Sequence, residues 1–146
     1  MTTILVTGSR KYSGDLAPYC DLLGQLAYQL FGDVPITMIH GGANGADDIA
    51  GQEGTKRGWT VVSHPADWDT YRKRAGPIRN GTLVAQCPHL ALAVLAANSI
   101  GTPGCLKKLA KSTSNVSSRL AYVLLIDADN GSSRWLTPSQ LYDEFA

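Results

Sequence analysis

The sequence has few cysteines, no long apolar run and no export signal, and each shortage excludes a class of protein. Its 146 residues contain only Cys20, Cys87 and Cys105, far apart and without a Cys-x-x-Cys pair. That spacing fits neither a disulfide-stabilised secreted domain nor a zinc site built from neighbouring residues. No apolar run reaches membrane-spanning length, and the segment Met1–Thr3 carries no basic charge of a secretion signal. We therefore expect a cytoplasmic protein without a membrane anchor, a metal or a cofactor.

Charge is also scarce. Charged residues make up 17% of the chain, and 13 basic residues against 12 acidic ones leave a net charge of +1. Such a chain has no field strong enough to attract nucleic acid as a whole, so DNA is not an expected partner. Lys107, Lys108 and Lys111 follow one another on a predicted helix and are interpreted as its solvated face. Any binding of an anion must therefore be local.

Apolar runs and helical periodicities alternate along the chain. Strands are predicted at residues 4–7, 35–40, 60–64, 90–96 and 121–126, and the first of these runs is typical of a strand buried on both faces. Helices are predicted at 15–31, from the glycine turn after residue 40 to about residue 56, at 78–86 and 102–111, and from Thr137-Pro138 to Phe145. Two polar stretches, 65–77 and 127–134, are predicted as loops. This order predicts one α/β domain over residues 1–146, with a doubly wound, mainly parallel five-stranded sheet and helices on both faces.

Two glycine-containing turns follow the first two predicted strands. In a parallel sheet, ligands bind at the carboxyl ends of the strands, where helix N-termini present free N–H groups. In the first turn, Gly8 would let a ligand approach the backbone, Ser9 could donate its hydroxyl and Arg10 could grip a phosphate. An ordinary strand-to-helix turn with a solvated arginine is the alternative interpretation.

The second turn is richer in glycine and small residues, and it suits a nest of N–H donors for an oxyanion. It consists of His40, Gly41, Gly42, Ala43, Asn44, Gly45, Ala46 and Asp47. Asp47 is a candidate for hydrogen bonding to a ribose or a base, and equally for capping the following helix. His40 could donate to phosphate, but a role in fixing the turn through the backbone is favoured.

Two further segments carry candidate binding residues. Trp68 and Tyr71 could hold an aromatic base between them, with Asp67 beside them, while Arg79 and Asn80, predicted at a helix start, could bind phosphate or ribose. Trp68 could equally be a packing anchor for its loop. The turn containing Gly101 and Thr102 opens another predicted helix, and Thr102 could cap that helix or contact phosphate.

These segments together resemble the SLOG superfamily, named for the SMF/DprA and LOG proteins, and within it the small YspA and YpsA-like group. The matching residues are Val6–Arg10, His40–Asp47, Pro65–Trp68 with Tyr71, Ala75–Pro77 with Arg79 and Asn80, and Gly101–Thr102. The resemblance implies a Rossmann-like sheet whose glycine loops bind nucleotides or nucleotide-derived signals, such as ADP-ribose-type or cyclic nucleotide molecules in conflicts between bacteria and phages. It also implies a homo-oligomer, a dimer or larger.

One departure from that family affects the expected activity. The phosphoribohydrolases of the superfamily carry a catalytic glutamate shortly after their second glycine motif, whereas Pro103, Gly104 and Cys105 follow Gly101-Thr102 here. The sequence therefore favours binding, by sensing or sequestering the ligand, over catalysis. The alternative is a phosphoribohydrolase-, nucleosidase- or phosphodiesterase-type hydrolase, with Asp47 or Asp67 as its catalytic carboxylate.

Overall fold

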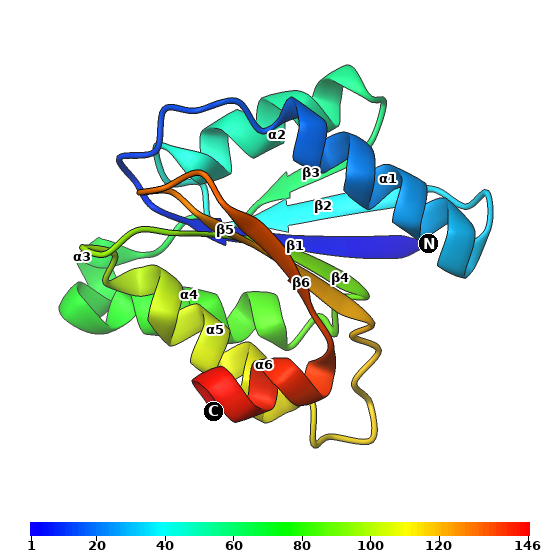
Figure 1. Ribbon diagram of the computed structural model, residues 1–146. Helices are drawn as coiled ribbons and strands as arrows, with labels where there is room; N and C mark the ends of the chain where they lie inside the picture. The colour runs from blue at the N-terminus through cyan, green and yellow to red at the C-terminus, as the bar shows by residue number, and fades with distance from the viewer.

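The five apolar runs and one further strand form a six-stranded sheet in the computed structural model, which describes all 146 residues (Figure 1). The strand order is β3-β2-β1-β4-β5-β6. The first five strands are parallel, and β6 lies antiparallel to β5. The strands are β1 (Thr2–Gly8), β2 (Ile36–His40), β3 (Thr60–Ser63), β4 (Leu90–Leu95), β5 (Tyr122–Asp127) and β6 (Ser133–Leu136).

Helices cover both faces of the sheet, as the alternating pattern predicted. One layer contains α1 (Ala17–Phe31) and α2 (Ala46–Lys56), and the other contains α4 (Ala75–Val84), α5 (Gly101–Ser112) and α6 (Pro138–Phe145) (Figure 1). Because successive side chains of a strand point to opposite faces, Ile4 and Val6 of β1 join the core beneath α1 and α2, while Leu5 joins the core beneath α4 and α5. None of these helices is both long and apolar enough to span a membrane.

The strand order reverses between β1 and β4. The chain proceeds from β1 to β2 and β3 on one side and from β4 to β5 on the other, so the loops that leave β1 and β4 run to opposite faces of the sheet. A crevice at the carboxyl ends of two such strands is where open α/β sheets bind ligands. In this chain those ends are Gly8 and Leu95.

Two of the predicted loops contain regular structure. The stretch 65–77 forms a short helix α3 (Trp68–Tyr71), a 3-10 turn η1 (Arg72–Arg74) and the first turn of α4, which begins at Ala75 and not at residue 78. The prediction of a five-stranded sheet missed β6, whose first two residues fall in the stretch predicted as a polar loop. Only Leu136 of β6 is buried, so this edge strand lacks the alternation that identifies a strand in a sequence.

The predicted start of the last helix is confirmed. The Thr137 hydroxyl accepts a hydrogen bond from the Gln140 backbone N–H, and the Gln140 side chain accepts one from the Thr137 N–H, which makes a capping box with Pro138 at the first helical position. This helix packs beside α5 on the lower layer in Figure 1.

Candidate functional site

The turn after β1 is packed against its neighbours. A Cβ on Gly8 would lie 2.6 Å from the Cβ of Ala46 and 2.9 Å from the Cβ of Val94, so the absence of a side chain lets β1, β4 and α2 approach one another. The Ser9 hydroxyl accepts a hydrogen bond from the Lys11 N–H at 3.3 Å. Gly8 and Ser9, which the sequence predicted to contact a ligand, therefore also have structural roles within the turn.

Arg10 is exposed and reaches an aromatic ring from another part of the chain. Its guanidinium carbon lies 5.3 Å from the centre of the Trp68 ring, which is within cation–π distance. Trp68 and Tyr71, both on α3, are 45% and 41% exposed. The predicted cationic and aromatic residues thus meet at the carboxyl edge of the sheet, with ring surface left open to solvent.

Three amides of the glycine loop bind the chain's own side chains. The N–H groups of Gly41 and Ala43 donate to Oδ2 of Asp47 at 3.1 and 3.3 Å, and the N–H of Gly42 donates to Nδ1 of His40 at 2.9 Å. The sequence predicted free donors here. The difference arises because α2 brings the Asp47 carboxylate back into the loop, where it takes the place of an external anion.

The next two amides of the loop are available. The N–H groups of Asn44 and Gly45 donate no hydrogen bond within the protein, and Asn44 is exposed just ahead of the N-terminus of α2. Gly45 has φ +77°, and a Cβ there would lie 2.4 Å from the Ser9 carbonyl oxygen. Any other residue at this position would be strained and would push the two turns apart.

Arg79 and Asn80 connect the glycine loop to the start of α5. They lie in the middle of α4 and not at a helix start as predicted, because α4 begins at Ala75. Nη1 of Arg79 donates to the Gly41 carbonyl at 2.6 Å, and its Nε donates to Oδ1 of Asn80 at 2.9 Å. Asn80 is buried and donates through Nδ2 to the Gly101 carbonyl at 3.4 Å. The Nη2 group of Arg79 is left without a partner in the protein.

Three other candidate residues, Asp67, Gly101 and Thr102, lie at the starts of α3 and α5. Asp67 is exposed and caps α3 by accepting a hydrogen bond from the Thr70 N–H at 3.1 Å. Thr102 is buried in the first turn of α5, whose N-cap is Ile100 and which has no side-chain cap, so the prediction that Thr102 caps this helix is wrong. Gly101 is the first residue of α5 and contributes its carbonyl to Asn80.

Burial shifts the pKa of Asp47 and His40, whose side chains accept hydrogen bonds from the loop amides. Asp47 is only 4% exposed, and this burial raises the pKa of its carboxyl to about 6, against the lowering effects of the Ala43 and Gly41 amides and of the Arg79 and Arg10 charges. Burial lowers the pKa of His40, which keeps the imidazole neutral so that Nδ1 can accept from Gly42. The second carboxylate oxygen of Asp47, Oδ1, is buried without a hydrogen-bond partner.

The raised pKa of Asp47 makes stability depend on pH. A carboxyl that binds its proton more tightly in the folded chain than in the unfolded one stabilises the fold below the unfolded pKa of 3.8, and this contribution is lost as pH rises through about 6. We expect the free energy of unfolding of the wild type to fall by about 2–3 kcal/mol between pH 4 and pH 7, and we expect this fall to be absent in Asp47→Asn. Urea titrations across that range measure it. The same change at the exposed Asp48 is the control, and equal pH profiles for the wild type and Asp47→Asn would contradict the assignment.

Comparisons with known proteins bear on the family and the fold. Residues 2–71, from β1 to the end of α3, match the model of the YspA, cpYpsA-related SLOG family. The Gene 61 protein of Mycobacterium phage D29 is 32% identical over 117 residues, which cover 77% of this chain and 91% of that protein. The X-ray structure of TM1055 superposes with a TM-score of 0.53 at 19% identity, covering 76% of this chain and 69% of that chain, which supports the Rossmann-like fold.

Proposed function

The chain belongs to the YspA, cpYpsA-related SLOG family, and from that premise we propose that it binds a nucleotide-derived small molecule at the carboxyl edge of its sheet. The observation that carries the proposal is the position of Arg79. Two of its guanidinium nitrogens are fixed by Gly41 and Asn80, while the third is left for an outside acceptor. A guanidinium held in this way loses little conformational entropy when it binds a phosphate.

A phosphate has several donors in this arrangement. One donor is Nη2 of Arg79. The amides of Asn44 and Gly45 are two more, and they precede the N-terminus of α2, whose dipole favours an anion. The Asp47 carboxylate already satisfies the deeper amides, so the ligand's phosphate lies at the outer end of the loop. Trp68 and Tyr71 provide exposed ring surface on which a base stacks.

Binding without hydrolysis is the activity that these residues favour. The helix α5, which begins at Gly101-Thr102, contains no carboxylate, and Asp67 is engaged in capping α3. We infer that the protein senses or sequesters its ligand, an ADP-ribose-type or cyclic nucleotide molecule. The phage origin of the Gene 61 protein supports a role in conflict between phage and host.

Isothermal titration tests the proposal directly. We expect saturable heat with at least one of ADP-ribose, cyclic ADP-ribose isomers, NAD and cyclic dinucleotides, and an affinity that falls as salt is added, because the phosphate contacts are partly exposed. Ribose and adenine alone, which lack phosphate, are the controls. An absence of heat with every phosphorylated ligand would count against the proposal.

One observation favours hydrolysis as a second candidate. A carboxyl with a pKa of about 6, as in Asp47, can exchange a proton near neutral pH, which is the property of a general acid or base. If the protein is such a hydrolase, chromatography of nucleoside monophosphates and NAD derivatives incubated with it shows turnover that Asp47→Asn abolishes and Asp67→Asn does not. An unchanged substrate pool dismisses this candidate.

A further inference from the structure

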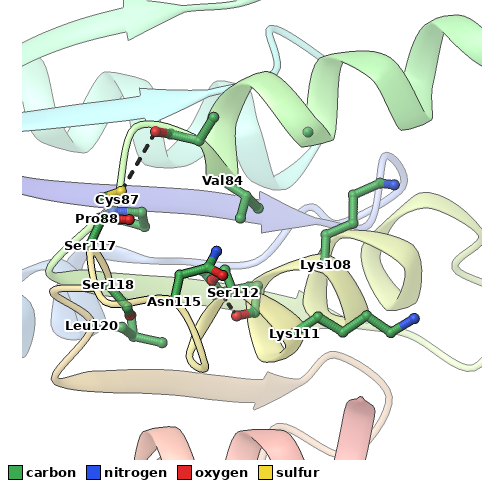
Figure 2. Close-up of a pocket in the computed structure, with 13 residues that line it drawn as sticks. Val84, Cys87, Pro88, Lys108, Lys111, Ser112, Asn115, Ser117, Ser118 and Leu120 are labelled. Carbon is green, nitrogen blue, oxygen red and sulfur yellow. Dashed lines mark hydrogen bonds between the residues drawn. The ribbon is translucent and has the colours of Figure 1, made fainter.

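A cavity lies away from the candidate site, at the amino edge of the sheet. It is a groove of about 620 Å³ between the C-terminal halves of α4 and α5 and the loop of residues 113–121 (Figure 2). Both helices start at the carboxyl edge of the sheet and run back along it, so their C-terminal ends lie at the amino edge. A molecule in this groove is therefore separate from a ligand at Arg79.

The floor of the groove is apolar. Val84 from α4, Leu109 from α5 and Leu120 from the following loop are each more than nine-tenths buried, and Pro88 continues this surface. The loop is fixed over the groove by Arg119, which donates from Nε to the Cys87 carbonyl at 2.9 Å and from Nη2 to the Gln86 carbonyl at 3.1 Å. The backbone segments that bound the cavity are therefore held together by hydrogen bonds.

The rim of the groove is cationic and contains no acid. Lys108 and Lys111 line it, both are exposed, and neither takes part in any of the ion pairs of the chain. None of the 13 lining residues is aspartate or glutamate. In Figure 2 the two lysine side chains extend toward the same end of the groove, away from Cys87 and Pro88. Two like charges without a counter-ion beside an apolar floor favour an occupant that is itself anionic.

The other end of the groove offers neutral hydrogen-bonding groups. The side chains of Asn115, Ser117 and Ser118 make no hydrogen bond within the protein, and Figure 2 places the two serines beside Cys87, Pro88 and Leu120. Free donors and acceptors at the far end of a cavity orient a bound molecule.

We propose that this groove binds a small amphipathic organic anion, with its acidic group between Lys108 and Lys111 and its apolar body on Val84, Leu109 and Leu120. The inference goes beyond the proposed nucleotide function and does not depend on it. The sequence interpretation treated all three lysines of α5 as a solvated face. In this proposal Lys108 and Lys111 bind the anion, and only Lys107 remains in solvent.

A pair of glycine substitutions provides the test. Gly81 lies in α4 on the wall of the groove, and a Cβ there meets no atom within 4 Å, so we expect Gly81→Leu to place its side chain in the cavity. Gly104 in α5 is equally open but lies outside the groove, which makes Gly104→Leu a matched control. The probe is 8-anilinonaphthalene-1-sulfonate, whose fluorescence rises on binding. We expect Gly81→Leu to weaken its binding by about tenfold or more and Gly104→Leu to leave it unchanged.

Cys87 gives a second readout in the unmodified groove. It is the one partly exposed cysteine, whereas Cys20 and Cys105 are buried, so iodoacetamide reports on Cys87 alone. Saturating probe is expected to slow its alkylation in the wild-type protein and in Gly104→Leu, but not in Gly81→Leu. Unprotected Cys87 together with a fluorescence titration that Gly81→Leu does not alter would overturn the proposal.

Lysine variants test the charge and do not depend on how Gly81→Leu folds. Lys108→Ala and Lys111→Ala are each expected to weaken binding of the sulfonate roughly fivefold, as for an exposed ion pair of about 1 kcal/mol, whereas Lys107→Ala has no effect. Equal effects of all three substitutions would show that the probe responds only to net charge, and would contradict a site at this groove.

Discussion

Replacing Arg79 by alanine is expected to weaken nucleotide binding by about 30- to 150-fold, which corresponds to roughly 2–3 kcal/mol for a hydrogen bond to a charged group. The substitution removes the free Nη2 donor and also releases the Gly41 carbonyl that Nη1 holds at 2.6 Å. Titration calorimetry with the phosphorylated ligand that binds the wild type measures the loss.

Two further variants separate position from charge. Arg79→Lys keeps the positive charge but cannot bridge Gly41 and Asn80 while facing a ligand, so we expect it to recover only a small part of the affinity. Lys56→Ala removes one charge from the far end of α2, where Lys56 pairs with Glu53, and is expected to leave affinity unchanged. Wild-type affinity in Arg79→Ala would contradict the assignment of Arg79 to the ligand.

Gly8→Ala is expected to lower the free energy of unfolding by about 3 kcal/mol, at the upper end of what overpacking one methyl group costs. The new Cβ would lie 2.6 Å from the Cβ of Ala46 and 2.9 Å from that of Val94. Both of these Cβ atoms are bonded directly to the backbone, so neither can rotate away from the new methyl group. Either α2 or β4 must therefore move. Urea unfolding followed by circular dichroism measures the change.

The matched control for Gly8→Ala is the same substitution in open space. Gly104 lies inside α5, and a methyl group added there would meet no atom within 4 Å, so Gly104→Ala is expected to stabilise the chain by about 0.5–1 kcal/mol through helix propensity. The two substitutions therefore have opposite signs. A destabilisation below about 1 kcal/mol for Gly8→Ala would show that β1, β4 and α2 are not packed as tightly as described.

Local patterns were sufficient to predict most of the fold. Three of the five parallel strands, β1, β4 and β5, are almost fully buried apolar runs because helices cover both faces of the sheet there, and such runs are visible in the sequence. β6 could not be found in this way, because Ser133, Arg134 and Trp135 are exposed and the strand is defined by its pairing with β5. The helical segments between residues 68 and 74 are short, and none of their residues is buried, so they leave no periodicity to detect.

The candidate site was predictable as a set of residues but not as a set of contacts. Glycine turns at strand ends identified the carboxyl edge, and the structure brings Arg10 to Trp68 and Arg79 to Gly41 there. No local pattern indicates that Asp47 binds the loop amides, since this depends on the angle at which α2 leaves the turn. The lysine-rimmed groove was also missed, because its lining comes from three separate segments and carries no motif.

The most direct test of the binding site is an amide NMR titration with ADP-ribose or whichever phosphorylated ligand gives heat. We expect the N–H signals of Asn44 and Gly45, which donate to nothing in the protein, to shift strongly and to saturate together with the Nη and Nε signals of Arg79. The amides of Gly41 and Ala43, held by Asp47, are expected to shift less. Saturable binding that leaves Asn44, Gly45 and Arg79 unshifted would contradict a phosphate site at this edge of the sheet.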